Sequence, residues 1–422
     1  MSETNFQKLS RKALKKKLVN LAIDFSLLPL AIPLLIVRYI FNIKFFRVHG
    51  SRFGHLAMNN ETFLRKRQLG LITEKGEKRV KYIGIAPTIV CNQPLLDMYK
   101  RYLTIIQIPQ PRFFRTITKI MAEKSILSRW DLYVVLAYDL AYFPQFNEAK
   151  PALSFTSQEE ASGKELLKRM GLKSKDWFIC FHARDGAYVS PLLKRGDSRY
   201  SYRNSSIENF AKAANYITQQ GGYALRMGAK VDTKLPEWNN SKIIDYATQQ
   251  AHHRTELGDI YLPAKCKFFV GSGSGVASIA EIFNVPEVRI NFIPLYPLIP
   301  NFKLHHFPPG KKDLFIPKKI WSNEKKRFLT FKEEIDFDLN IFSFEGEDYR
   351  KAGLVPVENT PEEIVDLARE MNRRLDGTWK TTEEDEKLQH SFKALFQYQG
   401  KPYKSSARIG TKFLRENQYL LD

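Results

Sequence analysis

The sequence has 422 residues, 43% of them hydrophobic and 13% aromatic, which favours two domains with separate cores and argues against a disordered chain. Its three cysteines form no CxxC pair and have no histidine at metal-ligand spacing, so neither a disulfide framework nor a zinc site is expected, and a reducing compartment fits. The formal net charge of +21 requires an anionic partner, such as nucleic acid, a membrane surface or a phosphorylated substrate.

The first 44 residues combine a basic cluster with an apolar stretch. The cluster lies between Arg11 and Lys17, and residues 18–37 approach the length of a spanning helix but contain Asp24 and two prolines. Basic residues also follow, so the positive-inside rule favours a helix that dips into one leaflet and returns. With no nucleic-acid-binding signature present, residues 1–44 are predicted to associate with an anionic membrane surface, at the cytoplasmic face of the bacterial inner membrane. A helix docked on the protein's own core is the alternative.

Residues 45–160 alternate short apolar runs with helical periodicity, which is typical of βαβ units. Strands are expected at 45–50 and 79–86, and helices at 60–67, 93–104 and 112–128. This part is predicted to be an N-terminal Rossmann-like domain. The segment 146–163, rich in polar and charged residues, is the expected interdomain connection.

Residues 161–345 repeat the same alternation and predict a second Rossmann-like domain. Residues 205–222 are predicted to be a helix, with serine at its start and two glycines at its end. The other elements are expected as strands at 177–183, 223–228, 242–246, 267–271 and 286–292, and a helix at 276–283. Residues 346–422 are predicted to form a charged helical tail. The fold class is therefore α/β, with two Rossmann-like domains between the membrane-associated segment and the tail.

The most informative segment is KFFVGSGSGVASIAEIF, in which a strand delivers glycines and serines onto a helix start. Gly273 and Gly275 let backbone N–H groups approach an anion closely, and Ser272 and Ser274 add hydroxyl donors. Open α/β sheets bind ligands at the carboxyl ends of their strands. The segment lacks the Walker lysine and is not a GxGxxG fingerprint, so we expect it to hold the diphosphate of a nucleotide-sugar. An ordinary tight turn is the alternative.

A second segment, FICFHARDGAY, ends the first strand of the same domain with Arg184 and Asp185. The planar guanidinium of Arg184 can bind two phosphate oxygens at once and neutralise a leaving nucleoside diphosphate. Asp185 can orient Arg184 or hold an acceptor hydroxyl. An Arg–Asp ion pair on the surface is the alternative.

Four further residues are candidates for donor binding. Arg226 ends the strand of YALRMG, and Gly228 beside it permits a close backbone approach. Arg226 either contacts the base, ribose or diphosphate, or only braces its loop. Asp245 ends the next strand, and Asp259 lies at a helix start. Both are predicted to read a nucleobase, although an acidic residue at a helix N-terminus also serves the helix dipole.

In the first domain, the loop HGSRFGHLAMNNE is predicted to project Arg52, His55 and Glu61 toward an acceptor. Histidine is the side chain best poised to take up a proton near neutral pH, so His55 is the candidate general base. A structural histidine is the alternative.

These segments together resemble a bacterial family of predicted glycosyltransferases from surface-polysaccharide gene clusters. The matching text is RFGHLAMNNE, FICFHARD, YRNSSIENFAKAANYITQQGGYALRMGAKV and DIYLPAKCKFFVGSGSGVASIAEIFNVP, and the resemblance covers most of residues 46–345. A fainter similarity reaches the fucosyltransferases that use GDP-fucose. Arg184-Asp185 stands where those enzymes have a doubled arginine, and this departure weakens the case for fucose transfer.

The resemblance implies a metal-independent, inverting glycosyltransferase of the GT-B architecture, with no cofactor. Its partners would be a nucleotide-sugar and a lipid-linked or glycan acceptor of bacterial surface polysaccharide, without nucleic acid. Two other readings remain open. One is a nucleotide-sugar 2-epimerase of the same fold, which would not need residues 1–44. The other is a non-catalytic, membrane-bound scaffold of a polysaccharide assembly complex.

Overall fold

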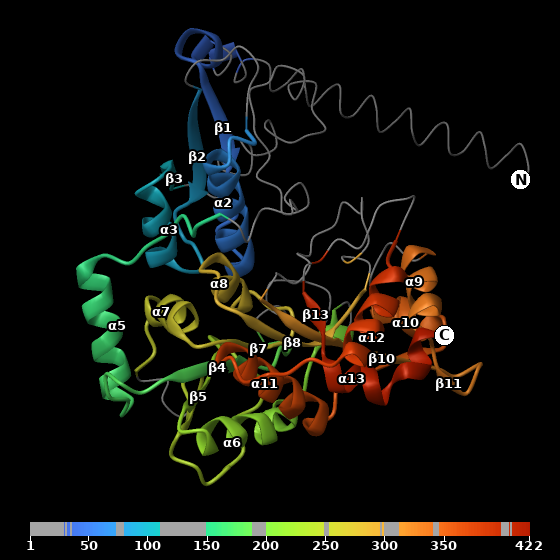
Figure 1. Cartoon of the computed structure of the whole chain (residues 1–422). Helices are drawn as coiled ribbons and strands as arrows, with labels where there is room; N and C mark the ends of the chain where they lie inside the picture. Colours follow the sequence, from blue (N-terminus) through green and yellow to red (C-terminus); the bar gives the residue numbers. More distant parts are fainter. Residues whose placement is uncertain are drawn as a thin grey trace, which may run out of the picture. The chain divides into compact units, whose positions relative to one another are not determined.

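The computed structural model describes residues 29, 32–33, 36–72, 80–109, 149–187, 200–248, 253–295, 298, 312–340, 346–397, 405 and 407–422. The chain divides into two compact units, Met1–Ala137 and Tyr138–Asp422, which we call unit 1 and unit 2 (Figure 1). None of the described helices is both long enough and apolar enough to cross a membrane. The apolar stretch 18–37 lies largely outside the described residues.

Unit 1 contains a three-stranded parallel sheet in the order β1 (Ile43–Arg47), β2 (Lys81–Pro87), β3 (Thr104–Ile108). Helix α2 (Phe53–Gln68) follows β1 and helix α3 (Gln93–Lys100) follows β2, which confirms the expected βαβ pattern. Two expectations were wrong. Helix α2 begins at Phe53, inside the predicted loop, and the predicted helix 93–104 ends early because the alternating TIIQI sequence forms β3. The predicted helix 112–128 lies outside the described residues.

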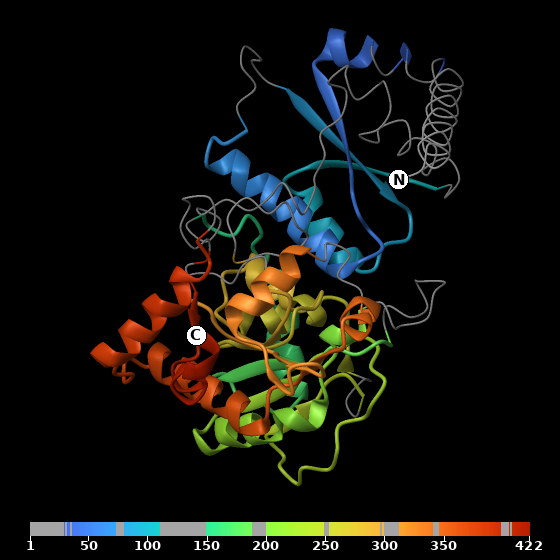
Figure 2. The ribbon, with the colours of Figure 1, turned by 90° about the vertical axis from the view of Figure 1, so that its right-hand side faces the viewer.

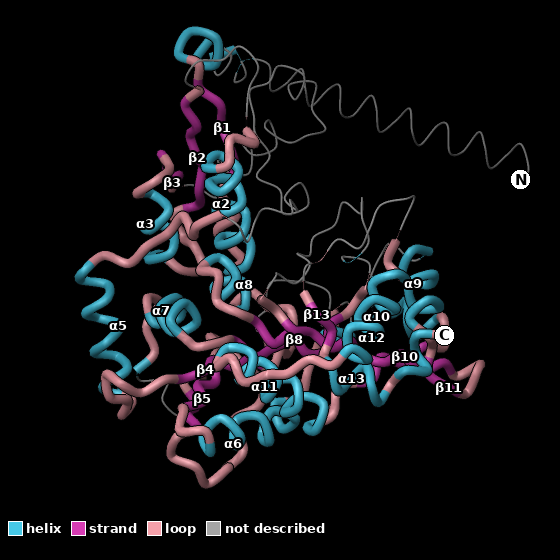
Figure 3. Tube along the Cα trace, in the orientation of Figure 1, coloured by secondary structure: helices cyan, strands magenta, loops and turns pink. Residues whose placement is uncertain are grey.

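Unit 2 is built on a seven-stranded sheet in which every neighbouring pair is parallel (Figure 3). The order is β13 (Arg408–Ile409), β9 (Leu314–Pro317), β8 (Glu287–Phe292), β7 (Phe269–Gly271), β4 (Phe178–His182), β5 (Tyr223–Arg226), β6 (Ile243–Asp245). The predicted strands 177–183, 223–228, 242–246, 267–271 and 286–292 thus all form. A wholly parallel sheet requires crossover helices on its faces, and this explains the alternating pattern of the sequence.

Both faces of this sheet are covered, because successive side chains of each strand point to opposite sides. On β4, Ile179 and Phe181 join one apolar cluster, together with α6 (Ala211–Gln219) and α11 (Pro361–Leu375). Phe178 and Cys180 join another, together with α5 (Ser157–Arg169), α7 (Gly258–Lys265) and α8 (Ala277–Ile282). Figure 1 shows α6 and α11 on one side of the strands and α7 and α8 on the other. The predicted helix 205–222 forms as a 3-10 turn, η5 (Ile207–Phe210), followed by α6.

The segment predicted as a helical tail is helical over α10 (Gly346–Lys351), α11, α12 (Glu383–Ala394) and α13 (Thr411–Glu416), and it also contributes strands. Strand β13 extends the seven-stranded sheet, and β12 (Leu354–Val357) pairs with β10 (Lys319–Ser322) in a small antiparallel sheet with β11 (Arg327–Phe328). Phe392 of α12 is fully buried against Phe315 of β9. Figure 2 shows these red helices against the rest of unit 2, so they complete its core.

Candidate functional site

The carboxyl ends of β4 and β7 lie side by side, since the two strands are parallel neighbours with His182 opposite Gly271. The segments that follow them, HARD and GSGSG, therefore start at one edge of one sheet. This confirms that Arg184 and the glycine–serine turn share an edge. A Cβ on Gly271 would come within 2.9 Å of the His182 carbonyl oxygen, so the turn tolerates no side chain there.

Within the turn, the two serines differ. The Ser274 hydroxyl accepts a hydrogen bond from the Ala277 backbone N–H at 3.5 Å and so serves the start of α8. Ser272 is 1% exposed, and among the residues that the structure describes its hydroxyl has no hydrogen-bond partner. Buried hydroxyls are normally paired, because leaving one without a partner costs roughly 1–3 kcal/mol. Ser272 is therefore the serine with hydrogen-bonding capacity to offer a ligand.

Gly273 is exposed, and its carbonyl oxygen accepts a hydrogen bond from Nη2 of Arg203 at 2.7 Å. Arg203 ends the 3-10 turn η4 (Ser201–Arg203), which the sequence analysis did not consider. A Cβ on Gly273 would lie 3.1 Å from this guanidinium. The contact brings a second arginine to the turn.

Arg184 is buried, and its Nη1 donates to the Tyr200 carbonyl oxygen at 3.1 Å and to Oδ1 of Asn204. Its own carbonyl oxygen accepts from the Ser205 N–H at 2.9 Å. Segment 200–205 thus forms hydrogen bonds with both the backbone and the side chain of Arg184. These bonds hold the guanidinium at the sheet edge.

Lys318, which directly follows β9, contacts the same asparagine. Its ammonium donates to the Asn204 carbonyl oxygen at 2.8 Å, and the residue is 3% exposed. The sequence analysis did not single out Lys318, because a lysine in a run such as Pro317-Lys318-Lys319 is usually a solvated surface residue. Only the position of β9 in the sheet places Lys318 near Arg184, whose charge helps to lower the lysine's pKa after the larger effect of burial.

Asp185 is engaged by a neighbouring loop rather than by Arg184 in the contacts that the structure shows. Its carboxylate accepts from the Asp232 N–H at 2.8 Å and from the Ala187 N–H at 3.1 Å. In return, Asp232 accepts from the Gly186 N–H at 3.1 Å. Asp185 therefore fastens the start of its loop to the segment after β5, and its predicted catalytic role remains a prediction.

Arg226 and Asp245 form a buried ion pair with an N–O distance of 3.2 Å. Arg226 also donates to the Thr233 carbonyl oxygen at 2.6 Å, and Asp245 accepts from the backbone N–H groups of Leu235, Ala247 and Thr248. Both charges are thus compensated within the protein. The geometry favours loop bracing, which was the alternative for Arg226, and it gives Asp245 the same task.

Gly228 lies beside His182 at the same edge. Its φ of 157° falls in the region that favours glycine, and a Cβ there would meet Val231 at 2.6 Å. Nδ1 of His182 lies 2.8 Å from the Met227 carbonyl oxygen, so it carries the proton and donates. Burial lowers the pKa of His182, which keeps the ring neutral near pH 7.

Asp259 lies in the first turn of α7 and binds Arg254 through both carboxylate oxygens, at 2.5 and 3.1 Å. Burial outweighs this partner and raises the pKa of Asp259 to about 6. The carboxylate is occupied by Arg254, so the structure gives no sign of the predicted nucleobase contact.

In unit 1, the early start of α2 places the residues predicted to face the acceptor in different positions: Arg52 at the N-cap, and His55 and Glu61 within the helix. Arg52 is exposed at its N-cap, and His55 lies in its first turn, with its ring 5.7 Å from that of His49. Burial, helped by Arg47, His55 and Arg52, lowers the pKa of His49 to about 4. The cluster gathers two imidazoles and two arginines between the end of β1 and the start of α2, and the sequence analysis did not single out His49 or Arg47.

Glu61 does not project from a loop as predicted. It lies within α2, fully buried, and its Oε1 is 2.7 Å from Nε of Arg65. Because α2 starts at Phe53, Glu61 turns into the interior of unit 1. Arg65 provides the compensating charge one helical turn later.

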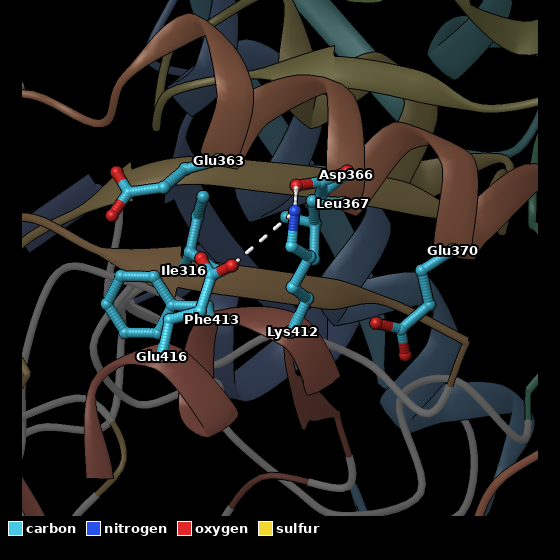
Figure 4. A pocket seen from close by; sticks show the side chains of 9 residues that line it. Ile316, Glu363, Asp366, Leu367, Glu370, Lys412, Phe413 and Glu416 are labelled. Carbon is cyan, nitrogen blue, oxygen red and sulfur yellow. Dashed lines mark hydrogen bonds and ion pairs between the residues drawn. The ribbon is translucent and has the colours of Figure 1, made fainter.

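One small pocket lies between α11 and α13 (Figure 4). Its acidic residues have partners of their own: Asp366 binds Lys412, Glu370 accepts from Thr411, and Glu363 binds Lys319. The pocket is therefore explained by helix packing. Among the described residues, no group of three His, Cys, Asp or Glu side chains is arranged to hold a metal ion.

No family model matches the sequence, and no curated protein matches it. Among solved structures, the chain is similar to ADP-heptose LPS heptosyltransferase II of E. coli (14% identity, TM-score 0.41, covering 79% of this chain and 99% of that one). It is also similar to a family 9 glycosyl transferase of Veillonella parvula (12% identity, TM-score 0.43, covering 78% of this chain and 96% of that one). A third similar structure is the dodecameric iron-containing heptosyltransferase TibC, solved with ADP-D-β-D-heptose (11% identity, TM-score 0.39, covering 79% of this chain and 77% of that one). Similarities this low assign no function to the chain.

We expect Asp245→Asn to lower the free energy of unfolding by about 3 kcal/mol, because it leaves Arg226 buried without its counter-charge. Nucleotide affinity of the folded protein should be unchanged if Asp245 only braces its loop. Urea denaturation and nucleotide titration measure the two effects separately. Asp336→Asn, at an exposed ion pair with Lys332, is the control, with an expected change within about 0.5 kcal/mol. Altered nucleotide preference without loss of stability would restore Asp245 as a base-reading residue.

Proposed function

We propose that the protein is a glycosyltransferase that moves a sugar from a nucleotide-sugar to an acceptor of bacterial surface polysaccharide. Unit 2 would bind the donor and unit 1 the acceptor. The sequence resemblance to surface-polysaccharide glycosyltransferases suggests the reaction. The structure supports a donor site through one observation above others: the buried, partnerless hydroxyl of Ser272 lies in a glycine-rich turn at the edge that also carries Arg184.

The chemistry of this edge suits a departing nucleoside diphosphate. In the proposed displacement, the acceptor oxygen bonds to the anomeric carbon while the bond from that carbon to the diphosphate oxygen breaks. Arg184, the Ser272 hydroxyl and the backbone of 273–275 would stabilise the negative charge that develops on the leaving group. Ser274 supports them by holding the start of α8. We propose an inverting reaction without a metal ion, since the side chains already supply the positive charge.

The acceptor must lose its hydroxyl proton, and we propose His55 as the base. It lies in the first turn of α2, beside the exposed Arg52, whose charge suits an anionic acceptor. His49 is neutral near pH 7 because its pKa is lowered to about 4, so it adds no second positive charge beside the proposed base. A neutral imidazole accepts a proton more readily when its neighbour is uncharged.

A nucleotide panel tests the donor site. We expect one of GDP, UDP, ADP or CMP to raise the melting temperature of the full chain, because a ligand that binds only the folded state stabilises it. Arg184→Ala should weaken that binding more than Arg184→Lys, since lysine keeps the charge but loses the planar fork. Arg327→Ala, at an exposed ion pair with Glu333, is the control and should bind normally. Absence of stabilisation by all four nucleotides would contradict the donor site.

His55→Ala tests the division of labour between the units. We expect transfer at saturating donor to slow by about 10²–10⁴-fold, which is the usual contribution of a general base, while donor affinity stays the same. Turnover and nucleotide titration are the measurements. His390→Ala, at an exposed histidine of α12, should leave both unchanged. Near-normal turnover of His55→Ala would show that the base lies elsewhere.

We also propose that the segment before β1 associates with an anionic membrane, where a lipid-linked acceptor would reside. Several large apolar side chains there are at least half exposed, among them Ile36, Ile40 and Phe41. The helix that carries them follows the basic sequence between Arg11 and Lys17. Apolar side chains beside positive charge are what interfacial helices use to bind anionic lipid.

Replacing Ile36, Ile40 and Phe41 together by serine should reduce binding to anionic vesicles by about a hundredfold, because each inserted side chain contributes on the order of 1 kcal/mol. Vesicle flotation is the measurement. Leu375→Ser removes an exposed apolar side chain of unit 2 and is the control. Unchanged flotation of the triple variant would place the membrane contact elsewhere or remove it from the proposal.

A further inference from the structure

Lys318 is a buried cation that forms no ion pair with the residues that the structure describes. It is 3% exposed, its ammonium makes one hydrogen bond, to the Asn204 carbonyl oxygen at 2.8 Å, and no carboxylate oxygen lies within 4.0 Å of it among the residues that the structure describes. Lysine is almost never fully buried unless it is paired, because removing an ammonium from water costs several kcal/mol. One neutral carbonyl does not repay that cost.

The adjacent Lys319 is paired with a carboxylate, as buried lysines usually are. Lys319 lies 3.0 Å from the carboxylate of Glu363 and also contacts Asn417. The negative charge of Glu358 raises the pKa of Lys318. The Glu358 carboxylate, however, accepts its hydrogen bonds from the Ser206 N–H and from Asn209. Within the described part of the chain, Lys318 therefore has no carboxylate at ion-pair distance.

The surroundings of Lys318 are the proposed donor edge. Asn204 joins Lys318 to Arg184, accepting from the lysine with its carbonyl oxygen and from the arginine with its side chain. Arg203, the preceding residue, binds the carbonyl oxygen of Gly273. The same turn holds the partnerless hydroxyl of Ser272. These three cations and the Ser272 hydroxyl thus lie close to segment 203–204. An anion with several oxygens is the ligand that such a set of donors suits.

We propose that Lys318 binds the phosphate oxygens of the departing nucleoside diphosphate, as a third cation beside Arg184 and Arg203. This inference rests on the proposed donor site and adds to it a residue that directly follows β9, the strand two places from β7 in the sheet. A diphosphate presents oxygens on two phosphorus atoms, so it can bind both Arg184, which follows β4, and Lys318, which follows β9. A nucleoside monophosphate offers one such group, and the site therefore selects diphosphate donors over CMP-linked ones.

Binding should be coupled to proton uptake. Burial, and then the charge of Arg184, lower the pKa of Lys318 to about 8, whereas Glu358 acts in the opposite direction. Near pH 8, about half of the free protein carries the proton on Lys318, and an adjacent phosphate would hold it fully on. We expect the binding of a diphosphate to take up roughly half a proton at this pH.

Isothermal titration of the full chain tests this inference, with inorganic pyrophosphate and the four nucleotides as probes, in two buffers of different ionisation enthalpy at pH 8. We expect Lys318→Met to weaken the binding of diphosphates by about 10–100-fold, the usual effect of losing a charged hydrogen bond, and to abolish proton uptake. Lys318→Arg keeps a charge that does not titrate, so it should bind without uptake. Lys319→Met is the matched control, with normal affinity and uptake.

The outcomes separate the inference from the proposed function. If the wild type binds a diphosphate and Lys318→Met binds it equally well with the same proton uptake, Lys318 has no role at the site while the donor site stands. Binding of CMP in preference to every diphosphate and to pyrophosphate would overturn the inference alone. If no probe binds the wild type, both fail. A purely structural lysine would show itself through a lower melting temperature of Lys318→Met with unchanged affinity.

Discussion

The parallel pairing of β4 with β7 is the constraint on which the candidate donor site depends. It places His182 opposite Gly271, so that two segments almost ninety residues apart in the sequence begin at one edge of one sheet. Close approach there requires glycine, because a Cβ on Gly271 would meet the His182 carbonyl oxygen. Everything that the site offers to an anion, from Arg184 to Ser272, is positioned by this register and by the crossover helices that a parallel sheet demands.

Segment 200–205 converts that edge into a cationic site. Its backbone and the Asn204 side chain accept hydrogen bonds from Arg184 and Lys318, and Arg203 reaches the glycine–serine turn. The acceptors that this segment offers to Arg184 and Lys318 are neutral. Arg226 shows the opposite case, because Asp245 neutralises it within the protein. A charge that is neutralised in this way holds a loop, whereas Lys318 has no carboxylate within ion-pair distance among the described residues.

Unit 1 organises its polar groups by the same logic. Glu61 is buried and paired with Arg65, and this pairing explains why a carboxylate can lie inside α2. His49 and His55 lie near each other where β1 passes into α2, with arginines on either side. The imidazole whose pKa is lowered stays uncharged, and the exposed Arg52 retains its charge. The proposed acceptor side therefore combines an uncharged imidazole, that of His49, with a cation.

The sequence by itself determined the α/β class, the positions of the strands in unit 2 and the edge where Arg184 and the glycine–serine turn meet, because alternating periodicity and glycine placement are local signals. It missed β3, the early start of α2 and the sheet strand within residues 346–422, where local patterns are short or ambiguous. Only the tertiary structure decided which polar residues are already paired. Asp245, Asp259 and Glu61 were candidate site residues in the sequence, and the structure shows that each forms an ion pair within the protein. Lys318 resembled a surface lysine until β9 took its place in the sheet, since its burial depends on contacts distant in sequence.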